Sequence, residues 1–164
     1  MNALSLAEVG AMPAVHQVPT PEQPPGTVRV RLTHAALNRR DVWITKGQYP
    51  NIVTPAILGS DGVGTLMTAT DRLPEGTRVV IYPSKYWGTN EAVQSADYEI
   101  LGMPSQGTFA EEIVVPASLV YAAPTHLTDS EAAALPLAGL TAWRSIFSRG
   151  ALQAGEHLLV TGIG

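Results

Sequence analysis

The sequence predicts a mainly β fold: a body of short strands, then a helical connector, then the start of one further strand. Three observations carry this prediction. Most of the 13 prolines and 15 glycines fall within residues 10–124, where they separate short apolar runs. Apolar residues at helical spacing replace that pattern after Pro124. The chain then ends in EHLLVTGIG (156–164), an apolar run followed by glycines. We therefore divide the chain into 1–124 and 125–164.

Short strands account for most of the predicted body. TVRVRLTHAAL (27–37) alternates between apolar and polar residues, as a half-buried strand does. One face carries Val28, Val30 and Leu32, and the other carries Arg29, Arg31 and Thr33. RVVIYP (78–83) and EIVVPA (112–117) are short apolar runs with proline at their ends, typical of strands in a packed or closed sheet. NRRDVWITKG (38–47) predicts one or two helical turns. Residues 84–106 show no period, and we expect a long loop.

The connector carries recognisable helix signals. Thr128 and Glu131 form a capping-box pattern, which predicts a helix that begins before AAAL. Pro136 breaks that helix or opens the next one, and Gly150 is the expected stop. The apolar residues at helical spacing between them are Leu140, Trp143 and Phe147. A strand is expected at about 157–161.

Composition excludes several function classes. The net charge of −4 gives no basic footprint for nucleic acid. The absence of cysteine excludes disulfides and thiolate metal sites. No apolar run approaches the roughly 20 residues of a membrane helix, and the first ten residues have no basic leader of a secretory signal. We expect a cytoplasmic protein that binds neither nucleic acid nor membrane.

Four stretches in this order resemble the medium-chain dehydrogenase/reductase superfamily, most closely its zinc-free quinone oxidoreductase branch. They are ALNRRDVWITKGQYP (36–50), PAILGSDGVG (55–64), LPLAGLTAWRSIF (135–147) and GEHLLVTGIG (155–164). The resemblance implies a GroES-like β-barrel as catalytic domain, followed by a Rossmann domain of which this chain holds only the first strand. Gly162 and Gly164 then begin a phosphate-binding turn. Without the helix that follows such a turn, we expect no dinucleotide binding in the family's manner and a catalytically silent fragment.

The same resemblance implies that the chain binds no zinc. The catalytic-zinc ligands of related enzymes correspond to Asn38, Ser60 and Leu137, whose side chains do not form a tetrahedral nitrogen and sulfur site. Residues 84–106 resemble the lobe that holds a structural zinc in relatives, with cysteine positions at or near Trp87, Asn90 and Val93. An ordinary solvated loop explains this segment equally well. In both cases Trp87, Tyr98 and Ile100 are expected to supply its packing.

A site without metal favours activated hydride acceptors. Hydride added to an unactivated ketone builds a localised alkoxide, which benefits from a Lewis acid, whereas a quinone or enone spreads the charge. The resemblance makes Asn38, Trp43 and Tyr49 the catalytic candidates that face nicotinamide and substrate. Asn38 also suits a helix cap, and core packing equally explains Trp43 and Tyr49.

Three further residues, Arg39, Thr141 and Asp61, have two interpretations each. The resemblance places Arg39 near the cofactor pyrophosphate and Thr141 against the nicotinamide. A solvated arginine and a helical threonine bonded to the preceding turn are the alternatives. Asp61 matches a buried acidic position with a basic partner, or serves as a turn residue before Gly62, and Asp41 is expected to fix the local turn.

The sequence thus predicts the catalytic domain of a zinc-free oxidoreductase that uses NADPH, with NAD also compatible, on a small quinone or enone. Two alternatives stay open: a GroES-like binding or structural module without chemistry, and an alcohol dehydrogenase-like ketone reductase. We also expect a homo-oligomer. Residues from about 128 onward should either pack against another copy of the chain or be poorly ordered, because apolar side chains there lack neighbours.

Overall fold

The structure of the chain is a computed structural model that describes residues 1–162. Its elements in chain order are β1 (Asn2–Leu6), β2 (Ala14–Gln17), β3 (Thr27–Ala36), α1 (Arg39–Thr45), β4 (Ala56–Ile57), β5 (Asp61–Leu66), β6 (Arg78–Ile81), β7 (Ser84–Lys85), β8 (Glu99–Leu101), β9 (Pro104–Ser105), β10 (Glu112–Pro116), the 3₁₀ turn η1 (Ala117–Leu119), β11 (Val120–Ala122), α2 (Asp129–Ala134), α3 (Pro136–Trp143) and the π-helical turn η2 (Arg144–Arg149).

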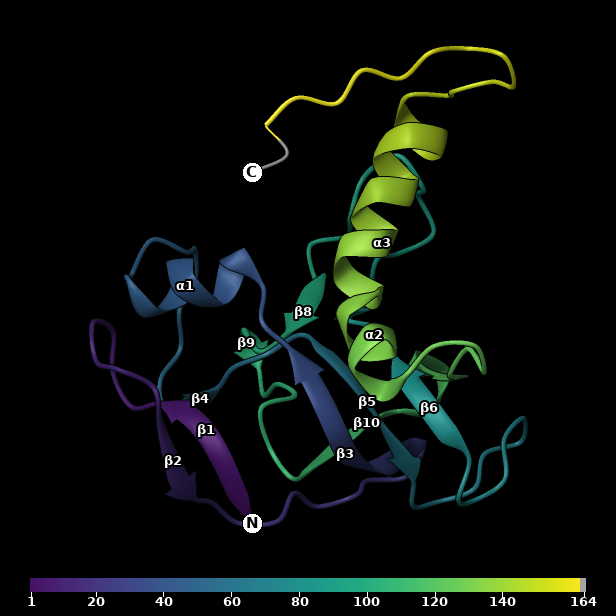
Figure 1. Cartoon of the computed structure of the whole chain (residues 1–164). Coiled ribbons are helices and arrows are strands. Elements are labelled where there is room, and N and C mark those ends of the chain that lie inside the picture. The colour runs from purple at the N-terminus through teal and green to yellow at the C-terminus, as the bar shows by residue number, and fades with distance from the viewer. Residues whose placement is uncertain (163–164) are drawn as a thin grey trace.

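Three sheets make up the body. The largest has the order β10-β3-β5-β6-β11, and its neighbouring strands are all antiparallel. Two small sheets, β2-β1-β4 and β7-β8-β9, lie beside it (Figure 1). A bridge between Ala3 and Ala110 joins β1 to the segment that leads into β10. The mainly β prediction is confirmed, and the strands form a curled half-barrel rather than one closed ring.

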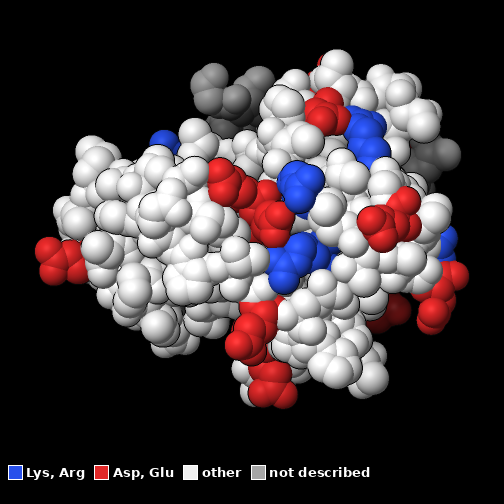
Figure 2. All heavy atoms as spheres, turned by 90° about the horizontal axis from the view of Figure 1, so that it is seen from below, with Lys and Arg blue, Asp and Glu red and all other residues white. Residues whose placement is uncertain are grey.

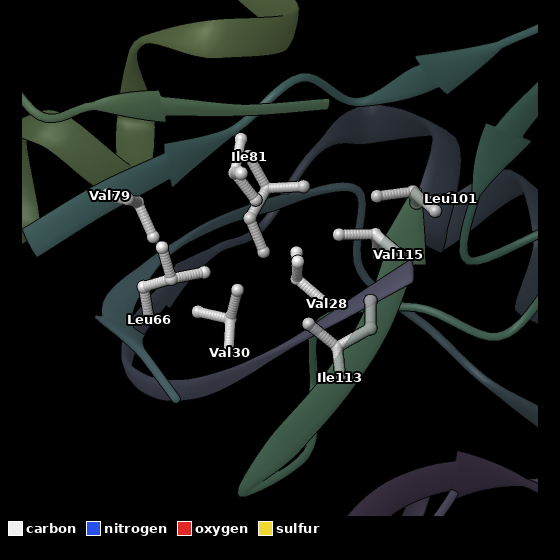
Figure 3. Packing of buried hydrophobic residues seen from close by; sticks show 9 residues of the cluster. Val28, Val30, Leu66, Val79, Ile81, Leu101, Ile113 and Val115 are labelled. Carbon is white, nitrogen blue, oxygen red and sulfur yellow. The ribbon is translucent and has the colours of Figure 1, made fainter. Parts of the chain in front are cut away.

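The main core fills the inner face of the large sheet. Val28 and Val30 of β3 are 2% and 0% exposed, while Arg31 on the opposite face lies in solvent. The predicted alternation is therefore confirmed. The nine buried residues of this core, which converge from several strands in Figure 3, are Val28, Val30, Leu66, Val79, Ile81, Leu101, Ile113, Val115 and Val120.

A smaller core holds α1 against the body. Asn38 is the N-cap of this helix, and the Gly47 amide bonds the Ile44 carbonyl oxygen at its end, as the sequence predicts. Ile44 is fully buried among four apolar residues of three other segments. These are Leu6, Ala56, Leu58 and Met103, with Tyr49 and Phe109 packed on them. The expected strands at 78–83 and 112–117 are present as β6 and β10.

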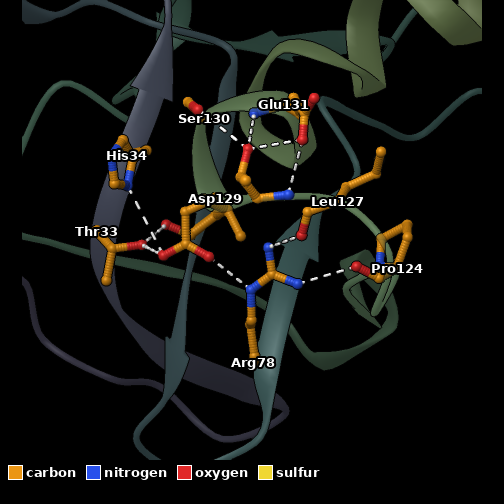
Figure 4. A network of polar contacts seen from close by, with 10 residues as sticks. Thr33, His34, Arg78, Pro124, Leu127, Asp129, Ser130 and Glu131 are labelled. Carbon is orange, nitrogen blue, oxygen red and sulfur yellow. Dashed lines mark hydrogen bonds and ion pairs between the residues drawn. The ribbon is translucent and has the colours of Figure 1, made fainter.

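A polar network attaches the connector to the large sheet (Figure 4). The predicted capping box forms, because the Glu131 carboxylate accepts from the Thr128 amide at 2.9 Å. Asp129 accepts hydrogen bonds from Thr33 of β3 at 2.7 Å and from Arg78 of β6 at 2.5 Å. Beneath these contacts the buried Ala132 and Ala133 of α2 pack with Val63 and Ala123 of the body.

The rest of the connector rises from the sheet as one rod. α3 begins at Pro136, and η2 continues it to its C-cap at Gly150 (Figure 1). Both helix signals are therefore confirmed. No residue of α3 or η2 is buried. Among residues 1–162, no helix has the length and apolarity needed to cross a membrane.

Two predictions about local structure are wrong. The strand expected at about 157–161 does not form, since no described residue pairs with this segment. A strand needs a neighbour for its backbone hydrogen bonds, and the apolar run supplies none itself. Residues 84–106, expected as a loop, contain the short strands β7, β8 and β9. Strands of two or three residues are too short to show a period.

Candidate functional site

A cleft of about 730 Å³ separates the body from the connector. Arg40 and Tyr49 line it from α1 and the loop that follows, and Trp87 lines it from the segment after β7. Leu137 and Thr141 line it from α3. Residues more than 90 positions apart therefore meet at one hollow, where aromatic, apolar and charged side chains converge. Small ligands generally bind in concave sites of this kind.

Arg40 lies at the floor of this cleft and is only 9% exposed. Its Nη1 donates to Ser60 Oγ at 2.6 Å and to the Leu101 carbonyl oxygen at 2.7 Å. Its Nη2 donates to the Met103 carbonyl oxygen at 3.2 Å and to the Tyr49 phenol oxygen at 3.3 Å. Its Nε is buried and has no partner among the described residues. The guanidinium thus joins α1 to the loop after β8.

The loop that receives Arg40 depends on a glycine. Gly102 has a φ of +88°, which favours glycine, and a Cβ there would lie 2.7 Å from the Gly59 carbonyl oxygen. This close approach holds the carbonyl groups of Leu101 and Met103 where Arg40 reaches both. A side chain at position 102 would push the loop away from the guanidinium.

The three positions that match zinc ligands are brought together around Asp61. Asn38 Nδ2 donates to Asp61 Oδ2 at 3.0 Å, and the backbone amide of Leu137 donates to Asp61 Oδ1 at 2.8 Å. Ser60 adjoins Asp61 in the chain and is fully buried. Asp61 is 1% exposed and therefore links α1, β5 and the start of α3. Asp61 therefore has a structural role beyond that of a turn residue, because its carboxylate joins segments that lie far apart in the sequence.

A second buried carboxylate, Asp41, fixes the same region from α1. Its Oδ2 accepts from the Asn38 amide at 2.8 Å and its Oδ1 from the Gly59 amide at 3.2 Å. These two contacts agree with the expectation that Asp41 fixes the local turn. Burial raises the pKa of both Asp41 and Asp61 above the usual 3.8, although their hydrogen-bond donors act in the opposite direction. The nearby positive charge of Arg40 also favours the ionised forms.

The predicted catalytic residues do not all reach the cleft. Tyr49 does, packed on the smaller core with the Arg40 guanidinium 4.9 Å from its ring centre. Asn38 Nδ2 is bonded to Asp61, so this donor is not free for a substrate. Asn38 is also the N-cap of α1, and the Asp41 carboxylate accepts from its backbone amide, as the helix-cap interpretation expects. Trp43 is 41% exposed on the outer side of α1, beside Arg39 and Lys46. The core-packing interpretation of Trp43 is therefore wrong. Arg39 lies exposed beside it, as the solvated-arginine alternative expects.

The predicted cofactor residues are dispersed. Thr141 lines the cleft, and its hydroxyl donates to the Leu137 carbonyl oxygen at 2.7 Å, as the alternative reading expects. Gly162 has a φ of +66° in the extended tail. Gly164 lies outside the described residues.

The segment between β7 and β8 forms the outer wall of the cleft. Trp87 and Tyr98 meet edge to face with ring centres 5.1 Å apart, the packing that the sequence predicts for them. The Arg144 guanidinium of η2 lies 4.4 Å from the centre of the Trp87 indole. It also donates to the Glu91 carbonyl oxygen at 2.9 Å. These contacts from the connector were not predicted.

Sequence reasoning missed Arg40, although a signal for it exists. In a helix, positions three and four apart share a face, and both Arg40 and Asp41 share one with the fully buried Ile44. Helical spacing therefore places Arg40 inward and its neighbour Arg39 outward.

The chain is similar to known proteins in sequence and in fold. The sequence profile of the alcohol dehydrogenase GroES-like domain family matches residues 24–125. The chain belongs to this family. Among curated relatives, a zinc-type alcohol dehydrogenase-like protein of Schizosaccharomyces pombe is 35% identical over 146 residues, covering 85% of this chain and 42% of its own. An acryloyl-coenzyme A reductase of Sulfurisphaera tokodaii is 29% identical, covering 90% of this chain and 47% of its own.

A solved structure agrees with the family assignment. A crystal structure of an NAD-dependent alcohol dehydrogenase is 35% identical and superimposes with a TM-score of 0.87, covering 95% of this chain and 49% of that one. The chain spans less than half the length of the curated relatives it matches. The predicted GroES-like fold of the medium-chain dehydrogenase/reductase superfamily is therefore confirmed.

Proposed function

We propose that this GroES-like domain is the substrate-binding half of a zinc-independent oxidoreductase that transfers hydride from NADPH to a quinone or an enone. One observation carries the proposal: the three positions that match zinc ligands hold an amide, a hydroxyl and an isobutyl group. Two of these positions already bond Asp61: Asn38 does so through its side chain, and Leu137 through its backbone amide. The third, Ser60, is bonded to Arg40.

These residues do not fit a catalytic zinc. Zinc prefers four tetrahedral ligands drawn from thiolate, imidazole and carboxylate groups. Within residues 1–162, no group of three or more histidine, cysteine, aspartate and glutamate side chains is placed to hold a metal. The similarity to proteins named zinc-type alcohol dehydrogenase-like therefore does not bring a zinc ligand set to this chain.

Tyr49 is the best-placed hydrogen-bond donor for a substrate oxygen. Its phenol oxygen accepts from Arg40 Nη2, so its own hydrogen is directed to another acceptor. A quinone or enone oxygen in the cleft is such an acceptor, and hydride addition makes it more negative. A fixed donor beside a buried guanidinium stabilises that charge because the site needs little reorganisation. Asn38 is less suited, because its amide is held by Asp61.

The cofactor supplies the hydride, and the domain supplies one wall of its site. Thr141 keeps lone pairs available while its hydrogen bonds the Leu137 carbonyl oxygen, so it can accept from a nicotinamide carboxamide. In this proposal Arg39, Gly162 and Gly164 serve the phosphates, Gly164 from outside the described residues.

The test is a steady-state assay on the protein as its gene encodes it. We expect NADPH oxidation with a benzoquinone and with an α,β-unsaturated ketone, little with a saturated ketone, and no loss after dialysis against a chelator. Metal analysis should give far less than one zinc per chain. Tyr49→Phe should lower kcat/KM about 100-fold, while Tyr121→Phe, at an exposed site on β11, serves as control. Activity that a chelator abolishes, or a preference for saturated ketones, would contradict the proposal.

A further inference from the structure

Positive charge is concentrated in the cleft of an otherwise acidic chain. The protein has a net charge of −4 with 10 basic residues, yet Arg40, Arg144 and Arg149 all line this one hollow. Glu91 is the one acidic residue among the described lining residues. On the face shown in Figure 2, by contrast, basic and acidic side chains lie interspersed. The cleft therefore differs in charge from the chain as a whole.

None of the three arginines is neutralised by a carboxylate contact. The ion pairs formed within residues 1–162 involve Arg29, Arg31, His34, Arg78 and Lys85. Arg40, Arg144 and Arg149 bond neutral oxygens instead. The buried carboxylates of Asp41 and Asp61 still act on the charge of Arg40 through space. For Arg144 and Arg149, neutral partners satisfy N–H groups but do not compensate the charge.

Two of these guanidinium groups converge on one atom. Arg144 Nη2 lies 3.5 Å from the Ala92 carbonyl oxygen, and Arg149 Nη1 lies 3.3 Å from the same oxygen. Two like charges held this close repel each other. A bound anion would offset that repulsion. It would also accept hydrogen bonds from N–H groups that do not bond the Ala92 carbonyl oxygen, since each guanidinium has five N–H donors.

We propose that the outer wall of the cleft binds an oxyanionic group, a phosphate or a carboxylate, between Arg144 and Arg149. The segment around Ala92 acts as the spacer that sets their separation. Arg40 lies deeper in the cleft, where the carboxylates of Asp41 and Asp61 act on its charge, so the anion site consists of Arg144 and Arg149 alone. The ligand of this domain is therefore anionic at the end nearest η2. This inference concerns binding alone and does not require hydride transfer.

The experiment is a titration of the 15N-labelled chain with inorganic phosphate at constant ionic strength, followed by NMR. We expect a dissociation constant on the order of millimolar, with shifts at the Ala92 amide and at the Trp87 indole N–H. Arg149→Gln should weaken binding about five- to tenfold, and Arg149→Lys should keep most of it, because the charge is retained. Arg144→Gln should weaken it similarly. Arg144→Gln also removes the contact with Trp87, which can disturb the wall of the cleft. Arg149→Gln does not remove that contact and therefore tests the proposal independently.

Arg72→Gln is the matched control. Arg72 also lies over an aromatic ring, Tyr121, at 5.4 Å, and also donates to two carbonyl groups, but outside the cleft. We expect its phosphate affinity to equal that of the unchanged chain. Phosphate shifts spread over the whole surface, or equal weakening in Arg72→Gln and Arg149→Gln, would overturn the proposal.

Competition then identifies the source of the anion. Displacement of phosphate by cinnamate but not by neutral cinnamamide assigns the group to the substrate. Displacement by NADPH assigns it to the cofactor. Either result supports an oxyanion site, whereas failure of both to compete would overturn it. Because no turnover is measured, a negative result here leaves the quinone reductase proposal to its own assay.

Discussion

The strand body and the connector contain similar apolar residues, but only the body buries them. Val30, Leu66 and Val79 are fully buried between strands that neighbour one another on both sides. In the connector, Trp143 and Phe147 are 63% and 46% exposed. Periodicity indicates that an element exists, whereas burial requires a partner surface. α2 illustrates this within the connector, because its alanines are buried where they meet the sheet and α3 beyond it buries nothing.

Paired leucine substitutions give the largest expected contrast. Leu66→Ala in β5 should lower the free energy of unfolding by about 3 kcal/mol, because it leaves a cavity among buried strands. Leu159→Ala, at a residue 86% exposed, should change it by less than about 0.5 kcal/mol. Urea denaturation followed by circular dichroism measures both. Equal losses in the two variants would show that the tail packs in solution.

The same contrast explains how much the sequence predicts. The alternation over 27–33 and the capping box at Thr128 depend only on residues close in the sequence, and the structure contains both features. The strand expected at about 157–161 depends on a partner that no local pattern reveals. In the site, residue types identify Asn38, Ser60 and Leu137 as poor zinc ligands. Their convergence on Asp61 comes from contacts 23 and 76 residues apart, which only the fold supplies.

Two arginines allow the same comparison among polar contacts. Arg40 in the body and Arg144 in the connector each lie over an aromatic ring and donate to carbonyl groups. Arg40→Met should cost about 2–3 kcal/mol, because it leaves buried acceptors without donors. Arg144→Met should cost less than about 1 kcal/mol, since water reaches its acceptors. The measurement is again urea denaturation, and a loss for Arg144→Met as large as that for Arg40→Met would contradict this difference.

The carboxylates of the two regions should respond to pH in opposite directions. Hydrogen bonds from Thr33 and Arg78 lower the pKa of Asp129 below 3.8, so its contribution is complete above that pH and is lost as pH falls through the lowered pKa. Asp129→Asn should therefore destabilise by less than about 1 kcal/mol at pH 7, and its effect should vanish in acid.

Asp61 provides the counterpart in the body. Its raised pKa means that the folded chain binds a proton more tightly than the unfolded chain, so stability is lost as pH rises through the raised pKa. The change in the free energy of unfolding caused by Asp61→Asn should therefore be more favourable at pH 7 than at pH 3. In this variant the side-chain amide of Asn38 turns over, so that its oxygen accepts from the new amide. Unfolding curves over this range measure both variants, and parallel pH profiles would contradict the assigned shifts.

The smallest expected effect concerns association through the connector. Trp143 and Phe147 form an exposed aromatic pair with ring centres 4.5 Å apart, and Leu159 and Val160 are exposed in the tail. Exposed apolar groups that lie together favour contact with a second copy. Light scattering should show a mass that rises with protein concentration, and the double variant Trp143→Gln, Phe147→Gln should reduce that rise. Leu37→Gln is the control, because Leu37 is 81% exposed but lies in the body beside α1. A monomer at every concentration, or an equal reduction by Leu37→Gln, would show that the connector does not drive association. The exposed aromatic pair would then be compatible with a monomer, and the contrast between body and connector would concern folding alone.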